Sequence, residues 1–133
     1  MELSEEYRKY KWFYTKSGKL VIGGKSAVQN EDLLSKVLKS KKKYIIMHTK
    51  EPGSPFTVIL SDTKKVSKAD LEECASFTAC FSKAWKNKRK QVSVDIFSTS
   101  QLFKTKSMKT GTFGVKPPID RLSVLMKLAL TKQ

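Results

Sequence analysis

The sequence predicts an α+β fold: a largely antiparallel, twisted sheet with two main helices packed on one face. Three observations lead to this prediction. The 133 residues are enough for one domain with a substantial core. Short β-rich segments outnumber helical ones, and the two kinds do not alternate as they would in a doubly wound parallel sheet. Because no internal repeat or linker-like composition divides the chain, we expect a single domain over residues 1–133.

The expected strands are short runs rich in β-branched and aromatic residues. They lie at residues 11–14, 20–22, 44–48, 56–60, 92–97 and 111–115. The first two flank a Lys-Ser-Gly-Lys turn and should form a hairpin. Residues 51–55, Glu-Pro-Gly-Ser-Pro, can only be a turn. Residues 122–130 fit either a strand or a helix.

Two capping boxes mark the starts of the expected helices. Ser26 with Gln29 opens a helix that should run to about Leu38. Ser67 with Asp70 opens a second helix. Its apolar stripe at helical spacing consists of Leu71, Cys74, Phe77, Phe81, Ala84 and Trp85.

The charge balance predicts a polyanionic partner. Lys and Arg number 27 against 12 acidic residues, which gives a net charge of +15. The excess lies in two blocks, residues 33–61 and 83–116, which flank a nearly neutral helical segment. Self-repulsion within such blocks is relieved by RNA, DNA, a ribosome or an anionic membrane surface. No apolar run is long enough to span a membrane, and the acidic N-terminus is not a signal peptide. We therefore expect a soluble, cytoplasmic protein without a membrane partner.

Most catalytic and metal chemistry is excluded by composition. The chain has one histidine, and its two cysteines, Cys74 and Cys80, lie on one expected helix at a spacing that prevents a disulfide. We expect both to be core residues. Without a metal-ligand set or a nucleophile–base pair, we expect no enzyme activity, catalytic residue, cofactor, metal or small-molecule substrate.

The run Gly24-Lys25-Ser26 lacks the first glycine of a nucleotide-binding phosphate loop. Two interpretations stay open for it. It is either a plain strand-to-helix turn or a place where backbone N–H groups meet one phosphate of a nucleic acid.

Basic residues in exposed segments are the candidate contacts to nucleic acid, because Lys and Arg bind phosphates without reading sequence. The strongest group follows the second helix, and the next lies in a Ser/Thr-rich stretch. The candidates are Lys83, Lys86, Lys88, Arg89 and Lys90, then Lys104, Lys106 and Lys109, then Lys41, Lys42 and Lys43, together with Lys25.

His48 and the aromatic residues of the first strand have two interpretations each. His48 ends an apolar strand beside a Gly-Ser turn. It is either a hydrogen-bonded structural residue or a contact to a phosphate or a base edge. Trp12 and Tyr14 alternate onto one strand face and Phe13 onto the other. One set must be core, and the other is available to stack on a base.

Several of these motifs, in order, resemble one family. Residues 11–15, Lys-Trp-Phe-Tyr-Thr, with Leu-Val-Ile-Gly-Gly-Lys at 20–25, resemble the opening of the NFACT-R domain. That domain is the RNA-binding module of the fibronectin-binding-like, ribosome-quality-control proteins. Met-His-Thr at 47–49 with the following Pro-Gly-Ser, Ser-Lys-Ala-Trp at 82–85 and Gly-Thr-Phe at 111–113 continue the resemblance.

The resemblance implies a function. It implies a non-enzymatic module that binds ribosomal RNA or tRNA, on the large ribosomal subunit. The alternatives are a scaffold that completes a larger assembly with NFACT-type domains on a separate chain, or a DNA-binding module. The N-terminal domain that recruits tRNA in long family members has no counterpart in this sequence, so its residues are not carried over.

Overall fold

The computed structural model describes residues 3–50, 53–82 and 91–125. Its helices are α1 (Leu3–Glu6), α2 (Ala27–Ser40) and α3 (Lys68–Cys80). Its strands are β1 (Lys11–Tyr14), β2 (Leu20–Gly23), β3 (Ile45–Thr49), β4 (Thr57–Ile59), β5 (Gln91–Ser98), β6 (Leu102–Phe103), β7 (Gly114–Val115) and β8 (Asp120–Leu125). Short 3-10 turns occur at η1 (Tyr7–Lys9), η2 (Thr63–Lys65) and η3 (Thr99–Gln101). None of the helices in these ranges is long and apolar enough to cross a membrane.

Six strands form one sheet in the order β1-β2-β4-β3-β5-β8, and each neighbouring pair is antiparallel. Strands β6 and β7 form a separate two-stranded ribbon. The α+β class and the antiparallel sheet are therefore confirmed. The 122–130 segment begins as strand, since β8 extends to Leu125, and residues 126–133 lie outside the described ranges.

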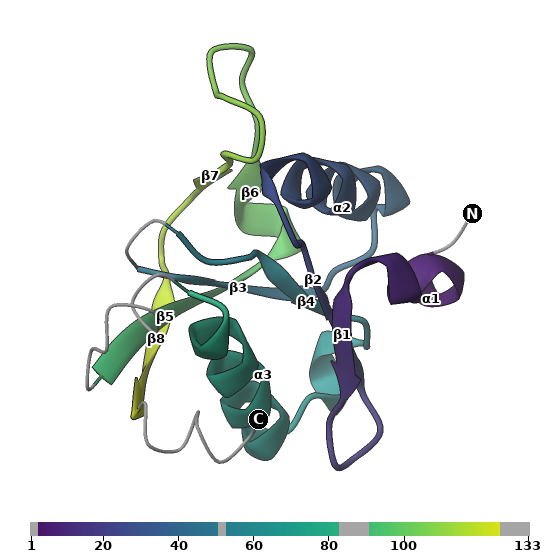
Figure 1. The fold of residues 1–133 in the computed structure, drawn as a ribbon, viewed down its shortest axis with the longest axis vertical. Helices are drawn as coiled ribbons and strands as arrows, with labels where there is room; N and C mark the ends of the chain where they lie inside the picture. Colours follow the sequence, from purple (N-terminus) through teal and green to yellow (C-terminus); the bar gives the residue numbers. More distant parts are fainter. Residues whose placement is uncertain (1–2, 51–52, 83–90, 126–133) are drawn as a thin grey trace.

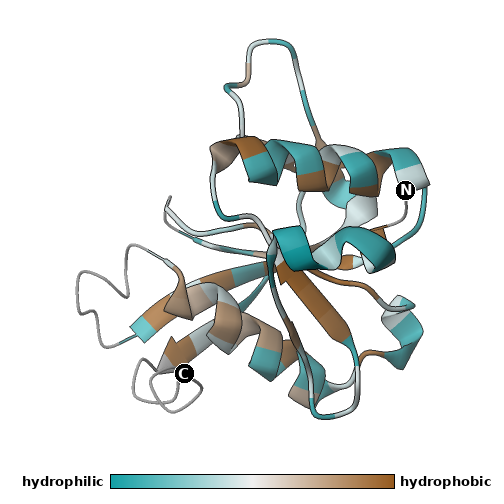
Figure 2. Cartoon of the chain, turned by 45° about the vertical axis from the view of Figure 1, so that its right-hand side comes forward, coloured by the Kyte–Doolittle hydropathy of each residue, from teal (hydrophilic) through white to brown (hydrophobic). Residues whose placement is uncertain are grey.

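The two main helices lie on opposite faces of the sheet, not on one face as expected (Figures 1 and 2). One core contains Leu33, Leu34 and Val37 of α2 with Ile22, Ile46 and Val58. The other contains Cys74, Ala75 and Ala79 of α3 with Val21, Met47 and Ile59. The central strands are apolar at successive positions, and successive side chains point to opposite faces. Both faces of the sheet are therefore apolar, and each is shielded from water by one of the two helices.

Both expected helix starts are confirmed, but only the second capping box is complete, because the Gln29 side chain accepts from the Lys25 N–H and not from the Ser26 N–H. The Ser26 Oγ accepts a hydrogen bond from the Gln29 N–H at 3.2 Å, and Ser67 and Asp70 form a reciprocal capping box. Helix α3 ends at Cys80, so Phe81, expected on its apolar stripe, is instead the exposed C-cap residue. The last two residues of that stripe, Ala84 and Trp85, lie outside the described residues. Both cysteines are free and buried, as expected.

Candidate nucleic-acid interface

A cleft of about 640 Å³ opens at the end of the sheet where β2 and β3 finish. Strands β1 and β4 begin at the same end, because Gly23 pairs with Lys11 on one side and with Thr57 on the other. Helix α2 starts there on one face, and α3 ends there on the other. The lining residues are Lys11, Gly24, Lys25, Ser26, Ala27, Asn30, His48, Lys50, Gly53, Ser54, Pro55, Phe56, Phe81, Thr110, Gly111, Thr112 and Phe113.

Close packing shapes the junction between β2 and α2. The Asn30 Oδ1 accepts a hydrogen bond from the Phe56 N–H at 3.2 Å, and a Cβ at Gly24 would lie 2.1 Å from that same oxygen. The Gly24 N–H donates to the Phe56 carbonyl, and the Lys25 N–H donates to Gln29 Oε1. These two amides are therefore engaged within the protein. The geometry favours the plain strand-to-helix turn over a phosphate cradle built from them.

The cleft is positively charged. Lys11, Lys25 and Lys50 line it, and none of the lining residues that the structure describes is acidic. Lys25 and Lys50 are exposed, whereas the Lys11 Nζ lies 3.7 Å from the centre of the Phe81 ring. The N-terminus of α2 adds a partial positive charge. This end of the sheet therefore attracts an anionic ligand.

The loop between β6 and β7 borders the cleft beside the start of α2 (Figure 1). Gly111 has φ +82, and a Cβ there would come within 2.8 Å of Ala27. The Gly111 N–H and the Lys104 Nζ both donate to Glu31 Oε1 at 2.9 Å. Glu31 thus ties this loop to α2, and these hydrogen bonds, that from Lys104 first, lower the pKa of its carboxyl.

Lys104 is a structural residue of this loop. Its Nζ donates to Glu31 Oε1 and also to the carbonyls of Lys109 and Thr112, both at 2.7 Å. An ammonium group has three protons, and these contacts use all of them. This differs from the expectation that Lys104 contacts phosphate. The side chains of Lys106 and Lys109, in the same loop, are exposed.

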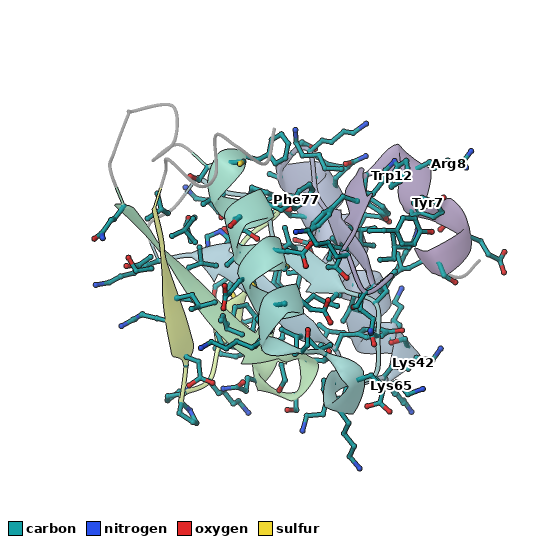
Figure 3. The ribbon with its side chains drawn as sticks, turned by 90° about the horizontal axis from the view of Figure 1, so that it is seen from below. Tyr7, Arg8, Trp12, Lys42, Lys65 and Phe77 are labelled. Atoms are coloured by element: carbon teal, nitrogen blue, oxygen red, sulfur yellow. The ribbon has the colours of Figure 1, made fainter. Side chains whose placement is uncertain are left out.

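The three expected contacts at residues 41–43 lie away from the cleft. Lys41, Lys42 and Lys43 follow the C-terminal end of α2, and its 14 residues span roughly 20 Å from the cleft end. In the view of Figure 3, Lys42 is labelled at the opposite side of the molecule from Trp12. The remaining candidates, Lys83, Lys86, Lys88, Arg89 and Lys90, lie outside the described residues.

His48 is held by two contacts at the end of β3. Its Nδ1 lies 2.7 Å from the Thr49 carbonyl oxygen, and its ring packs on Phe56 with 4.3 Å between centroids. Burial lowers the pKa of His48 from its usual value of about 6.5, against weaker opposing effects of Thr49 and Asp95. The imidazole is therefore neutral at pH 7.

His48 gives the protein a defined pH dependence. Because its pKa is lower in the folded than in the unfolded chain, the unfolded state binds more protons as the pH falls below about 6.5. We expect the free energy of unfolding to decrease between pH 7 and pH 5. His48 is the only histidine, and the variant His48→Phe, which keeps a ring on Phe56, should show a flatter dependence. Urea unfolding at several pH values measures this; an equal decrease in both proteins would contradict it.

The aromatic residues of β1 divide as the strand alternation requires. Phe13 packs against Phe77 of α3 with 4.7 Å between ring centroids, so it belongs to the core. Trp12 and Tyr14 are 41% and 52% exposed. Together with Tyr7, whose ring meets Trp12 edge-on at 5.0 Å, they form an exposed aromatic cluster (Figure 3). Trp12 and Tyr14 are thus the set available for stacking.

Sequence reasoning missed two basic residues of the cleft, Lys11 and Lys50. The sequence around Lys50 could have indicated a site residue, because Lys50 lies two residues after His48 and just before the Pro-Gly-Ser turn. The sequence around Lys11 contains no such indication. It reaches the cleft because the hairpin register sets it opposite Gly23.

The fold and the basic cleft, whose described lining holds three lysines and no acidic residue, define a domain suited to binding polyanions. The chain belongs to the family of the NFACT protein RNA binding domain, whose family model matches residues 9–117. The resemblance seen in the sequence is therefore confirmed.

Two curated proteins and, among the solved structures, a streptococcal protein illustrate what this chain is similar to. The "Archaeal Rqc2 homolog aRqcH" of Methanocaldococcus jannaschii is 42% identical over 80 residues, which is 60% of this chain and 12% of that protein. The Drosophila melanogaster "Ribosome quality control complex subunit NEMF homolog" is 30% identical over 80 residues, 59% of this chain and 8% of that protein. The C-terminal part of the fibronectin/fibrinogen-binding protein from Streptococcus suis superposes with a TM-score of 0.75 at 26% identity, covering 87% of this chain and 45% of that one. This chain thus spans only a small part of its curated relatives.

Proposed function

We propose that this chain is a non-enzymatic RNA-binding module that associates with ribosomal RNA or tRNA in ribosome-associated quality control. The observation that carries the proposal is the cleft, where Lys11, Lys25 and Lys50 converge and no described lining residue is acidic. The names of the similar proteins, an Rqc2 homolog and a ribosome quality control complex subunit, support the biological setting.

The contacts follow from the chemistry of each surface. In the cleft, Lys25 and Lys50 are exposed and bind backbone phosphates. The exposed aromatic cluster offers Trp12 and Tyr14 to unpaired bases. Further phosphate contacts come from the basic segment 83–90, from the exposed loop lysines 106 and 109, and from lysines 41–43.

Affinity for RNA is expected to depend strongly on salt. Each single-strand phosphate that a cation neutralises contributes about −0.7 to the slope of log K against log salt concentration. With about four to six contacts, we expect a slope of roughly −3 to −4. Fluorescence anisotropy with a labelled single-stranded RNA over a range of KCl concentrations measures this slope. A slope shallower than about −1 would contradict the phosphate-contact proposal.

A second candidate function is that of a scaffold, and the exposed aromatic cluster favours it. Two of its three residues, Trp12 and Tyr14, lie on β1, which pairs with β2 on one side only within the described part of the chain. An open strand edge with exposed aromatic rings suits another protein chain, including an NFACT-type domain. Sucrose-gradient fractionation of lysate separates the two candidates. Co-sedimentation with the large ribosomal subunit that is lost with salt and nuclease supports RNA binding, whereas a complex that survives both supports the scaffold.

A further inference from the structure

His48 presents a hydrogen-bond acceptor to the cleft. A carbonyl oxygen only accepts hydrogen bonds, so the 2.7 Å contact between Nδ1 and the Thr49 oxygen requires the proton on Nδ1. In a neutral ring, the other nitrogen, Nε2, then carries a lone pair. Among the residues that the structure describes, Nε2 has no hydrogen-bond partner, and the His48 side chain lines the cleft.

The charges around His48 keep it neutral near pH 7. Burial lowers its pKa, and Lys11, Lys25 and Lys50 line the same cleft. The acidic group that faces it is Asp95, its partner on β5, and the Asp95 carboxylate accepts a hydrogen bond from the Arg121 Nε at 2.8 Å. That ion pair weakens the effect of Asp95 on the imidazole. Within the described residues, no uncompensated acidic group therefore favours the protonated ring.

A lone pair cannot bind phosphate, because phosphate oxygens are themselves acceptors. The lysines of the cleft bind the phosphates. The Nε2 lone pair of His48 therefore requires a ligand group that donates a hydrogen bond. Along a nucleic-acid backbone, the donor next to the phosphates is the ribose 2′-hydroxyl, which DNA lacks.

Base N–H groups are a poorer match, because the described lining of the cleft offers little ring surface on which a base can stack: of its three Phe rings only Phe81 is exposed, at 39%. The Phe56 ring is buried under His48, and Phe113 is buried as well. The third ring, Phe81, carries the Lys11 ammonium group. The cleft is therefore suited to the sugar–phosphate backbone rather than to the bases.

We propose that Nε2 of His48 accepts a hydrogen bond from a ribose 2′-hydroxyl, so that the cleft selects RNA over DNA of the same sequence. This inference rests on the proposed RNA-binding function and names the group that is recognised. It replaces both functional alternatives for His48, a phosphate and a base edge, with the sugar.

The test compares three single strands of one sequence: RNA, DNA and fully 2′-O-methylated RNA. Binding of each is measured at pH 7.5 and fixed salt for the wild-type protein and for His48→Phe. Because the RNA complex has one hydrogen bond more than the DNA complex, we expect the wild type to bind RNA about three- to tenfold more tightly than DNA. The 2′-O-methyl strand has no donor and should bind like DNA. In His48→Phe, RNA affinity should fall to the DNA level, and DNA affinity should stay unchanged.

A measurement on the wild type alone makes the test independent of how well the variant folds. Protonation of His48 removes the lone pair at Nε2, so the ratio of RNA to DNA affinity should decrease towards one over the pH range in which the His48 ring itself titrates, followed by NMR of the only histidine. A ratio that stays constant while that ring becomes protonated overturns the inference. So does a folded His48→Phe variant that keeps the RNA preference, or that loses RNA and DNA binding equally. If the wild type binds no RNA at all, the proposed function itself is wrong.

Discussion

The double variant Lys25→Glu/Lys50→Glu is expected to bind single-stranded RNA about ten- to thirtyfold more weakly than the wild type. Both side chains are exposed at the cleft, and neither makes an ion pair within the described part of the chain. Each substitution removes one charge-assisted phosphate contact and puts a negative charge near the RNA. Thermal stability should change little, because exposed charge substitutions usually have small effects on the free energy of unfolding.

The matched control is Lys64→Glu/Lys65→Glu. These lysines lie in η2, are exposed, and carry the same charge, so the change in net charge is identical. They follow the end of β4 that is farther from the cleft. Anisotropy titrations at one salt concentration compare the variants. If the control loses as much affinity as the cleft variant, net charge rather than the cleft determines binding, and the proposed site is wrong.

The second large effect is expected from Lys86→Glu/Lys88→Glu/Arg89→Glu/Lys90→Glu. These four basic residues form the densest part of the 83–116 block, and they were the strongest candidates by composition. Reversing four charges should weaken RNA binding by more than about tenfold and make the salt slope shallower, because fewer phosphates are neutralised. The melting temperature should remain close to that of the wild type.

A comparison with Lys41→Glu/Lys42→Glu/Lys43→Glu identifies the main basic surface outside the cleft. The structure places these three lysines at the other end of α2, away from Lys25 and His48. If the 86–90 variant binds like the wild type and the 41–43 variant does not, the main surface lies in the 33–61 block. Circular dichroism of both variants confirms that they are folded.

Local sequence patterns determined most of the secondary structure. The hairpin at β1 and β2 and the caps at Ser26 and Ser67 depend on residues within a few positions of one another. Such short-range signals can be read from one sequence. The isolated elements β6 and β7 were harder to predict, because a two-residue strand carries almost no pattern. Strand β6 was not predicted at all, whereas β7 falls within the strand expected at residues 111–115.

Long-range contacts could not be predicted in this way. The ion pair between Lys104 and Glu31 joins residues 73 positions apart, and it turns an expected phosphate contact into a structural residue. The presence of Lys11 and Lys50 in one cleft likewise depends on the order of the strands in the sheet. Nothing in the local sequence specifies either arrangement.

The sequence by itself predicted a polyanionic partner and determined the class of fold. Net charge and the lack of catalytic residue sets are properties of composition, and α+β follows from the order of local patterns. Only the tertiary structure decided which face each helix covers, which lysines converge at the cleft, and which nitrogen of His48 contacts the Thr49 carbonyl. These depend on strand pairing and on the burial of two apolar sheet faces. Both arise only when distant segments pack together.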